Sequence, residues 1–199
     1  MAPLRRPVLR IATNRRWTAL ALALWCTACS QQAPPAAPLE TIATLQDLMR
    51  DEVDPCADYI WDSVGSITTA SGTVERQPRT DAEWAELRHN AVVLLEATNL
   101  LVIPGRQVSL TGFPSDGPGV LSSAEIQQRL TGHRAEFNGF AVALRGTARK
   151  VLAAVDARDS AALLHLGEEM DGACEACHLA NWYPHEVIPR LPANPPAAP

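Results

Sequence analysis

Four segments of this 199-residue chain repeat apolar side chains at the spacing of an α-helix. They run over about 41–65, 80–103, 122–155 and 160–180. Two short links and one longer Gly/Pro-rich loop, 105–119, separate them. We find no internal repeat, no strand-like alternation and no glycine-rich phosphate loop. The pattern therefore predicts an all-α fold, an antiparallel up-down-up-down four-helix bundle.

Local signals support these helices and suggest where they begin. Thr80 with Glu83, and Ser122 with Glu125, have the spacing of capping boxes, which satisfy the free amide groups at a helix start. Pro55 lies inside the first segment and cannot donate a hydrogen bond to the carbonyl four residues earlier. We therefore expect a kink or a short break in that helix.

Residues 1–29 have the layout of an export signal. They hold five arginines and no acidic residue, and the apolar run that follows, residues 17–25, is too short to span a bilayer. Small residues then precede Cys29, as in a bacterial lipoprotein signal, in which Cys29 is the acylated residue. Cys26 stands where such signals usually have leucine, so acylation is left open. The expected location is the periplasm, with a membrane tether if Cys29 is acylated.

The mature chain is predicted to have three parts: a Pro/Ala-rich linker over 30–39, the bundle over 40–184 and a Pro-rich tail over 185–199. Hydrophobic residues make up 47% of the sequence and charged residues 20%, which excludes general disorder. The net charge is −5 in spite of the arginine-rich start, and Lys150 is the only lysine. This acidic body argues against nucleic acid as a partner and favours a basic or neutral docking partner.

Cys174-Glu175-Ala176-Cys177-His178 is the Cys-x-x-Cys-His signature of covalent haem attachment. The two thiols add to the porphyrin vinyl groups, and the adjacent histidine binds the iron. A structural zinc site would need two more ligands, and Cys56 is the only other cysteine of the predicted mature body. A thioredoxin-like pair would start a helix beside a parallel sheet. We predict one covalent haem c, with a zinc or thiol protein as alternatives.

An export signal, four helices and this motif near the end of the last helix resemble the cytochrome c′ family of class II c-type cytochromes. The resemblance covers about 40–184, and the stretches 48–55, 84–92 and 174–184 are similar to one subgroup of it. It implies a haem inside a four-helix bundle and no catalysis. It also leaves open pairing into a homodimer.

The resemblance implies that the second axial ligand decides the function. Two protein ligands suit electron transfer with redox partner proteins, whereas one leaves iron open to NO or CO. Low-spin relatives take a methionine from the first helix, where Met49 lies on the inward stripe. Met170 shares the haem-bearing helix and is expected in the core. His133 is the main rival, although a histidine on an apolar stripe is more often a hydrogen-bonded core or rim residue. Cys56 shares the stripe of Met49 and could approach the haem, although a free cysteine is ordinarily a small buried hydrophobe. We predict electron transfer through Met49 and His178, with a five-coordinate gas-binding protein as the alternative.

Four further residues are candidates for contact with the haem. Arg106 and Arg145 are candidates for pairing with haem propionates, and the sequence does not choose between them. Trp182 and Tyr183 follow the motif directly and could cover the haem edge. The simpler expectation is that they fold over the apolar end of the bundle.

Overall fold

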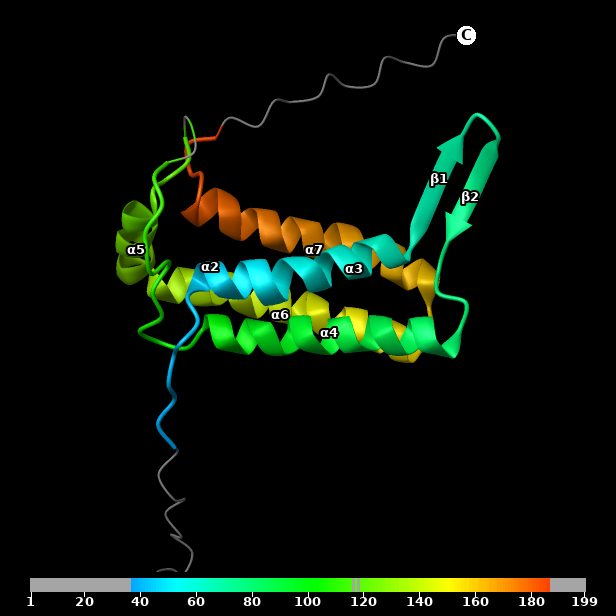
Figure 1. The fold of residues 1–199 in the computed structure, drawn as a ribbon, viewed down its shortest axis with the longest axis horizontal. Coiled ribbons are helices and arrows are strands. Elements are labelled where there is room, and N and C mark those ends of the chain that lie inside the picture. Colours follow the sequence, from blue (N-terminus) through cyan, green and yellow to red (C-terminus); the bar gives the residue numbers. More distant parts are fainter. Residues whose placement is uncertain (1–36, 116, 118, 187–199) are drawn as a thin grey trace, which may run out of the picture. The chain divides into compact units, whose positions relative to one another are not determined.

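Four long helical stretches pack as an antiparallel bundle in the computed structural model, as predicted (Figure 1). The structure describes residues 37–115, 117 and 119–186, so the predicted signal with Cys29, most of the linker and residues 187–199 lie outside the described part. The first stretch combines α2 (Leu45–Leu48), η1 (Met49–Val53) and α3 (Asp54–Ser63), and it is followed by α4 (Asp81–Leu101), α6 (Arg134–Asp156) and α7 (Ser160–Asn181). Within the described residues, no helix has the length and apolar character needed to cross a membrane.

The first stretch contains a wide turn just before Pro55. Thr44 and Asp47 close a capping box at its start. In η1, the Asp54 backbone amide donates to the Met49 carbonyl, five residues back instead of four. A proline in a regular α-helix clashes with the carbonyl of the preceding turn, and a wider turn removes that clash. The interruption predicted at Pro55 therefore takes the form of one π-helical turn.

The third predicted segment is two helices, so the prediction of one helix over 122–155 is wrong. α5 (Ser123–Gly132) ends at His133, whose φ of −122° and ψ of 36° are not helical. α6 then starts at Arg134, with the Phe137 amide donating to the His133 carbonyl. Gly132 weakens a helix at this point because it gains backbone entropy on leaving it. α5 lies at one end of the bundle and out of line with α6 (Figure 1).

A two-stranded hairpin joins α3 to α4, where no strand was predicted. β1 (Gly65–Thr69) pairs antiparallel with β2 (Gly72–Arg76), and Ile67 lies opposite Val74. The hairpin extends beyond the bundle (Figure 1), and almost all of its residues are exposed. A hairpin without a buried face leaves no clear alternation of apolar and polar residues, which explains why the sequence pattern missed it.

Two clusters of buried side chains form the core. The larger lies among the four helices, and its fully buried members include Leu87, Leu94, Val151, Leu163 and Met170. The smaller lies where α5 and the 102–122 loop close the bundle, and it includes Leu45, Leu48, Leu101, Ile126, Leu130 and Phe137. α4 packs against α6, and α6 against α7, over long stretches, whereas α3 and α7 make few contacts. The bundle is therefore open along one of its interfaces.

Candidate functional site

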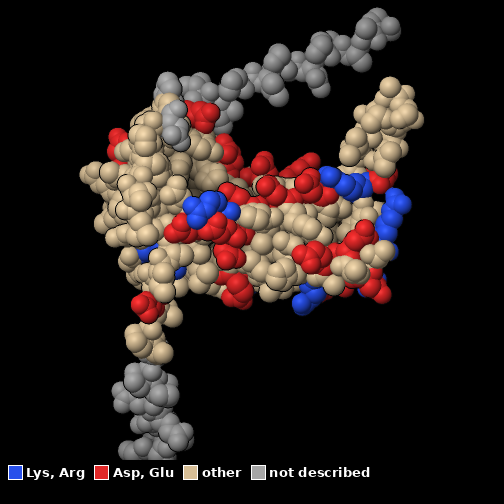
Figure 2. All heavy atoms as spheres, in the orientation of Figure 1, with Lys and Arg blue, Asp and Glu red and all other residues tan. Residues whose placement is uncertain are grey.

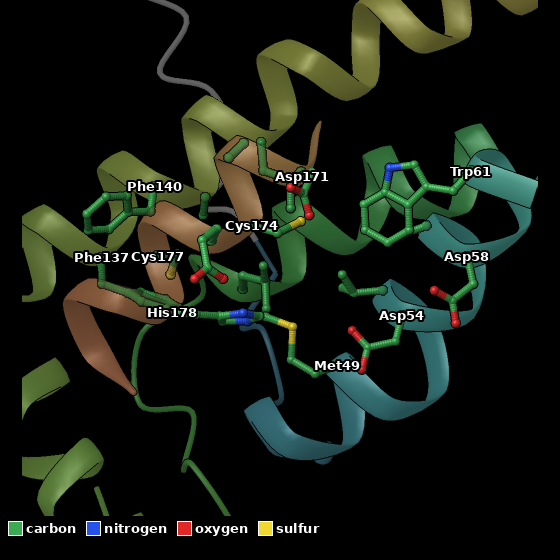
Figure 3. A pocket seen from close by; sticks show the side chains of 17 residues that line it. Met49, Asp54, Asp58, Trp61, Phe137, Phe140, Asp171, Cys174, Cys177 and His178 are labelled. Atoms are coloured by element: carbon green, nitrogen blue, oxygen red, sulfur yellow. The ribbon is translucent and has the colours of Figure 1, made fainter. Parts of the chain in front are cut away.

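A cavity of about 360 Å³ lies where α3 and α7 are held apart. This is within the range of roughly 300–1,000 Å³ that is usual for ligand pockets. Phe137, Phe140 and Leu144 of α6 supply aromatic and aliphatic walls, and Leu101 of α4 adds to them. Apart from Ala141 on α6, the remaining lining residues come from the first helical stretch and from α7 (Figure 3). The cavity is thus largely apolar and bordered by the two separated helices.

The Cys-x-x-Cys-His motif lies on the α7 side of this cavity. Cys174, Cys177 and His178 all line it, and all three are half-buried. Burial raises the pKa of both thiols to about 11. The negative charges of Asp171 and Asp54 raise the Cys174 pKa further. Both cysteines are therefore neutral thiols near pH 7 in the chain without a bound group.

The two residues after α7 hold its end in place behind His178. The Trp182 ring stacks on Phe113, with centroids 6.4 Å apart, and the Trp182 carbonyl accepts from the Leu121 amide at 2.8 Å. The Tyr183 ring lies 6.0 Å from the His178 ring, and its hydroxyl donates to Glu175 at 2.8 Å. Trp182 packs into the smaller core cluster, as the simpler expectation had it.

Met49 approaches the same cavity from the opposite side. It is half-buried in η1 and contacts both core clusters. In Figure 3, Met49 and His178 both point into the cavity, from the first helical stretch and from α7 respectively. Met170, in contrast, is fully buried in the larger cluster, as expected for a core residue. Of Met49 and Met170, the two methionines that the structure describes, only Met49 lines the cavity that His178 also lines.

His133 and Cys56 lie outside the cavity lining. His133 ends α5 with its side chain 58% exposed and Glu136 3.7 Å away, so it does not reach the cavity. Cys56 is buried in the larger core cluster and is not part of the cavity lining. Neither side chain therefore lines the cavity that Met49 and His178 share.

Neither candidate arginine for the propionates lines the cavity. Arg106 is buried and donates to the backbone carbonyls of Leu100 and Ala43, so it ties the end of α4 to the start of the bundle. Arg145 donates to the hydroxyl and the carbonyl of Thr98, each at 3.1 Å. Both guanidinium groups are engaged in holding α4, and neither is part of the cavity lining.

Sequence reasoning missed the acidic mouth of the cavity. Asp54 and Asp58 on α3, with Asp171 and Glu175 on α7, line it, and none of its 17 lining residues is Lys or Arg. Acidic side chains gather over α3 and α7 on the face shown in Figure 2. Burial raises the pKa of Asp54, although the nearby His178 opposes that shift. Each pair is spaced by four residues, so each falls on one helix face, a signal the sequence did contain.

The cavity residues fit a covalently held haem better than the two alternatives. Among the described residues, no three His, Cys, Asp or Glu side chains are close enough together to bind a metal ion. The only sheet in the described ranges is the exposed hairpin, so the motif is not beside a parallel sheet. The cavity walls are apolar, with two thiols and an imidazole on one side and a thioether on the other. This set of groups suits a flat apolar macrocycle whose iron takes protein ligands.

Comparisons with known proteins find a limited structural similarity. No protein-family model matches the sequence, and no curated protein does. Among solved structures, a ferrous variant of cytochrome c prime from Alcaligenes xylosoxidans is similar, with 19% identity, a TM-score of 0.43 and coverage of 70% of this chain and 98% of that one. Another is named cytochrome c′, with 20% identity, a TM-score of 0.44 and coverage of 72% and 99%. At these values the proposals below rest on the chain's own residues.

Proposed function

We propose that this protein is an exported c-type cytochrome that carries one covalent haem and transfers electrons, with no catalysis of its own. The observation that supports it most is the cavity that Cys174, Cys177 and His178 share with Met49. Apolar side chains surround these four residues, and the α3–α7 interface is open where they meet. A haem supplies a reversible one-electron couple when bound, and the protein tunes it.

Each of the four residues has a distinct part in holding the haem. Cys174 and Cys177 would anchor the ring through two thioether bonds. His178 serves as the proximal ligand, and the Tyr183 ring behind it restricts its rotation. Met49 serves as the second ligand from the opposite helix. Met/His ligation fills both axial positions and raises the reduction potential, which suits an electron carrier.

The proposed setting follows from the sequence. Export to the periplasm by residues 1–29 and a tether at acylated Cys29 stay proposals, since both fall outside the described residues. The proposed partners are redox proteins with a basic or neutral docking surface, because the cavity mouth is acidic. A homodimer also stays open.

Absorption spectroscopy of protein made in cells with haem-attachment machinery tests the proposal. The wild type should give a low-spin ferric spectrum and a ferrous form that does not bind carbon monoxide readily. Met49→Ala should convert the ferric haem to high spin and let the ferrous form bind carbon monoxide. Met170→Leu, a volume-conserving change at the buried methionine, is the matched control and should leave the spectrum unchanged.

Two results would overturn the proposal in different ways. Protein without a Soret band under these conditions would exclude a c-type cytochrome. A wild type that is already high spin and shifts with carbon monoxide would exclude Met49 ligation, and it would favour the gas-binding alternative.

A further inference from the structure

Trp61 connects α3 to α7 at one end of the haem cavity. Its indole N–H donates to the backbone carbonyl of Gly167, with an N–O distance of 3.0 Å. Among the described residues, no other hydrogen bond joins α3 to α7. These two helices make few contacts, so this hydrogen bond is a direct link between them at this end of the cavity.

Gly167 is the surface on which the indole rests. A Cβ atom built at Gly167 would lie 3.2 Å from Trp61 Cδ1, which is tighter than an ordinary contact. Gly172, on the same helix, would meet nothing within 4 Å. Glycine inside a helix costs roughly 1 kcal/mol relative to alanine. The close approach of the indole explains why a glycine stands at position 167, whereas no such contact is present at Gly172.

The indole also lines the cavity itself. Trp61 is half-buried, and it points into the cavity from α3 in Figure 3. α3 and α7 run antiparallel, so their residues pair in opposite order along the interface (Figure 1). Met49 and His178 therefore border one end of the cavity, and Trp61, which donates to the Gly167 carbonyl, borders the other.

We propose that Trp61, seated on Gly167, is a contact residue for the bound haem that forms the wall at this end of the cavity and keeps water from the ring. The inference rests on the proposed haem function. A haem edge shielded from water has a higher reduction potential, because low-dielectric surroundings disfavour the more positively charged ferric state. Trp61 thus acts as a potential-raising residue without binding iron.

The experiment compares two glycine variants in the haem-loaded full-length protein. Gly167→Ala forces the indole to move by a few tenths of an ångström and should lower the midpoint potential, whereas Gly172→Ala is the matched control and should leave it unchanged. Trp61→Leu should lower the potential further. Trp61→Phe keeps an aromatic wall but loses the hydrogen bond, so its potential should lie between those of Trp61→Leu and the wild type.

Proton NMR reports the contact directly. The Trp61 indole N–H signal, identified by its loss in Trp61→Phe, should move more between the ferric and ferrous forms than the signal of Trp84. Trp84 is the internal control because it is buried on α4 and does not line the cavity.

The outcomes separate this inference from the proposed function. Equal midpoint potentials for Gly167→Ala and Gly172→Ala, or a Trp61 signal that moves no more than that of Trp84, would overturn the role of Trp61 while the haem stays attached. If Gly167→Ala does not fold, the potential of Trp61→Phe and the NMR signal still decide. Failure of the proposed function would show instead as a wild type without covalent haem.

Discussion

The α4–α6 and α3–α7 interfaces are built from similar amphipathic helices, yet one is filled and the other is open. Ala91 and Leu94 on α4, and Ala148 and Val151 on α6, are completely buried. Between α3 and α7, by contrast, lies a cavity that is lined by the Cys-x-x-Cys-His motif and by carboxylates. The filled interface holds the bundle together, whereas the open interface contains the cavity in which we propose that the haem is held.

Removing the two anchoring thiols tests the open interface, with the largest expected effect. In the double variant Cys174→Ser, Cys177→Ser we expect no covalent haem, because serine hydroxyls do not add to vinyl groups under the same conditions. Haem staining of the denatured protein on a gel measures the loss. Cys56→Ser is the control and should keep its haem, since Cys56 does not line the cavity. Haem that stays attached to the double variant would contradict the assignment.

Leu87→Ala tests the filled interface. Leu87 is fully buried in the larger core cluster, so truncation leaves a cavity and should lower the unfolding free energy by about 2–5 kcal/mol. Urea denaturation followed by circular dichroism measures it. Leu164→Ala removes a side chain that is 53% exposed and should cost much less. Equal losses in the two variants would mean that the filled interface is not the main source of stability.

The two motif thiols should respond to pH in a way that reports their burial. Because burial raises the pKa of Cys174 and Cys177 from 9.0 to about 11, the folded, haem-free chain holds their protons over this interval. Alkylation should therefore stay slow at mildly alkaline pH and accelerate as the pH approaches 11. Each unit of pKa is a factor of ten, so the rate at about pH 8 should be roughly 100-fold below that in urea. Similar rates with and without urea would show an exposed motif.

The smallest effect is expected at the outer surface of the filled interface. Arg88 donates to Asp156 at 2.8 Å, and both side chains are about half exposed to solvent. Exposed ion pairs contribute about 0–1 kcal/mol, so Arg88→Ala should change the unfolding free energy little, and even less in high salt. A loss as large as that of Leu87→Ala would show that this pair does more than a surface ion pair can.

The sequence was sufficient to predict the four long helical stretches of the bundle and the starts of α4 and α5. Apolar stripes of long helices are strong signals, and the capping boxes at Thr80 and Ser122 are present as predicted. The break at His133 was missed because the apolar stripe continues across it from α5 into α6, so periodicity alone cannot show a change of direction. The hairpin was missed because its residues are exposed on both faces.

The candidate site was only partly predictable. The motif specifies Cys174, Cys177 and His178 by spacing alone, and the helical stripe placed Met49 on the inward face. Trp61 could not be recognised as a cavity residue, because its contact with Gly167 joins positions 106 residues apart in sequence. The contacts of Arg106 and Arg145 could not be predicted for a related reason. A single sequence shows a charge but not the backbone carbonyls that already engage it.

The most direct test of the account is the intact mass and haem content of the mature protein from cells with the attachment machinery. The account predicts a mass that exceeds the mature chain by one haem, retained after denaturation, and a pyridine haemochrome spectrum of a haem with both vinyl groups converted to thioethers. A mature chain that carries no covalent haem under these conditions would contradict the claim that the open α3–α7 interface is a haem site.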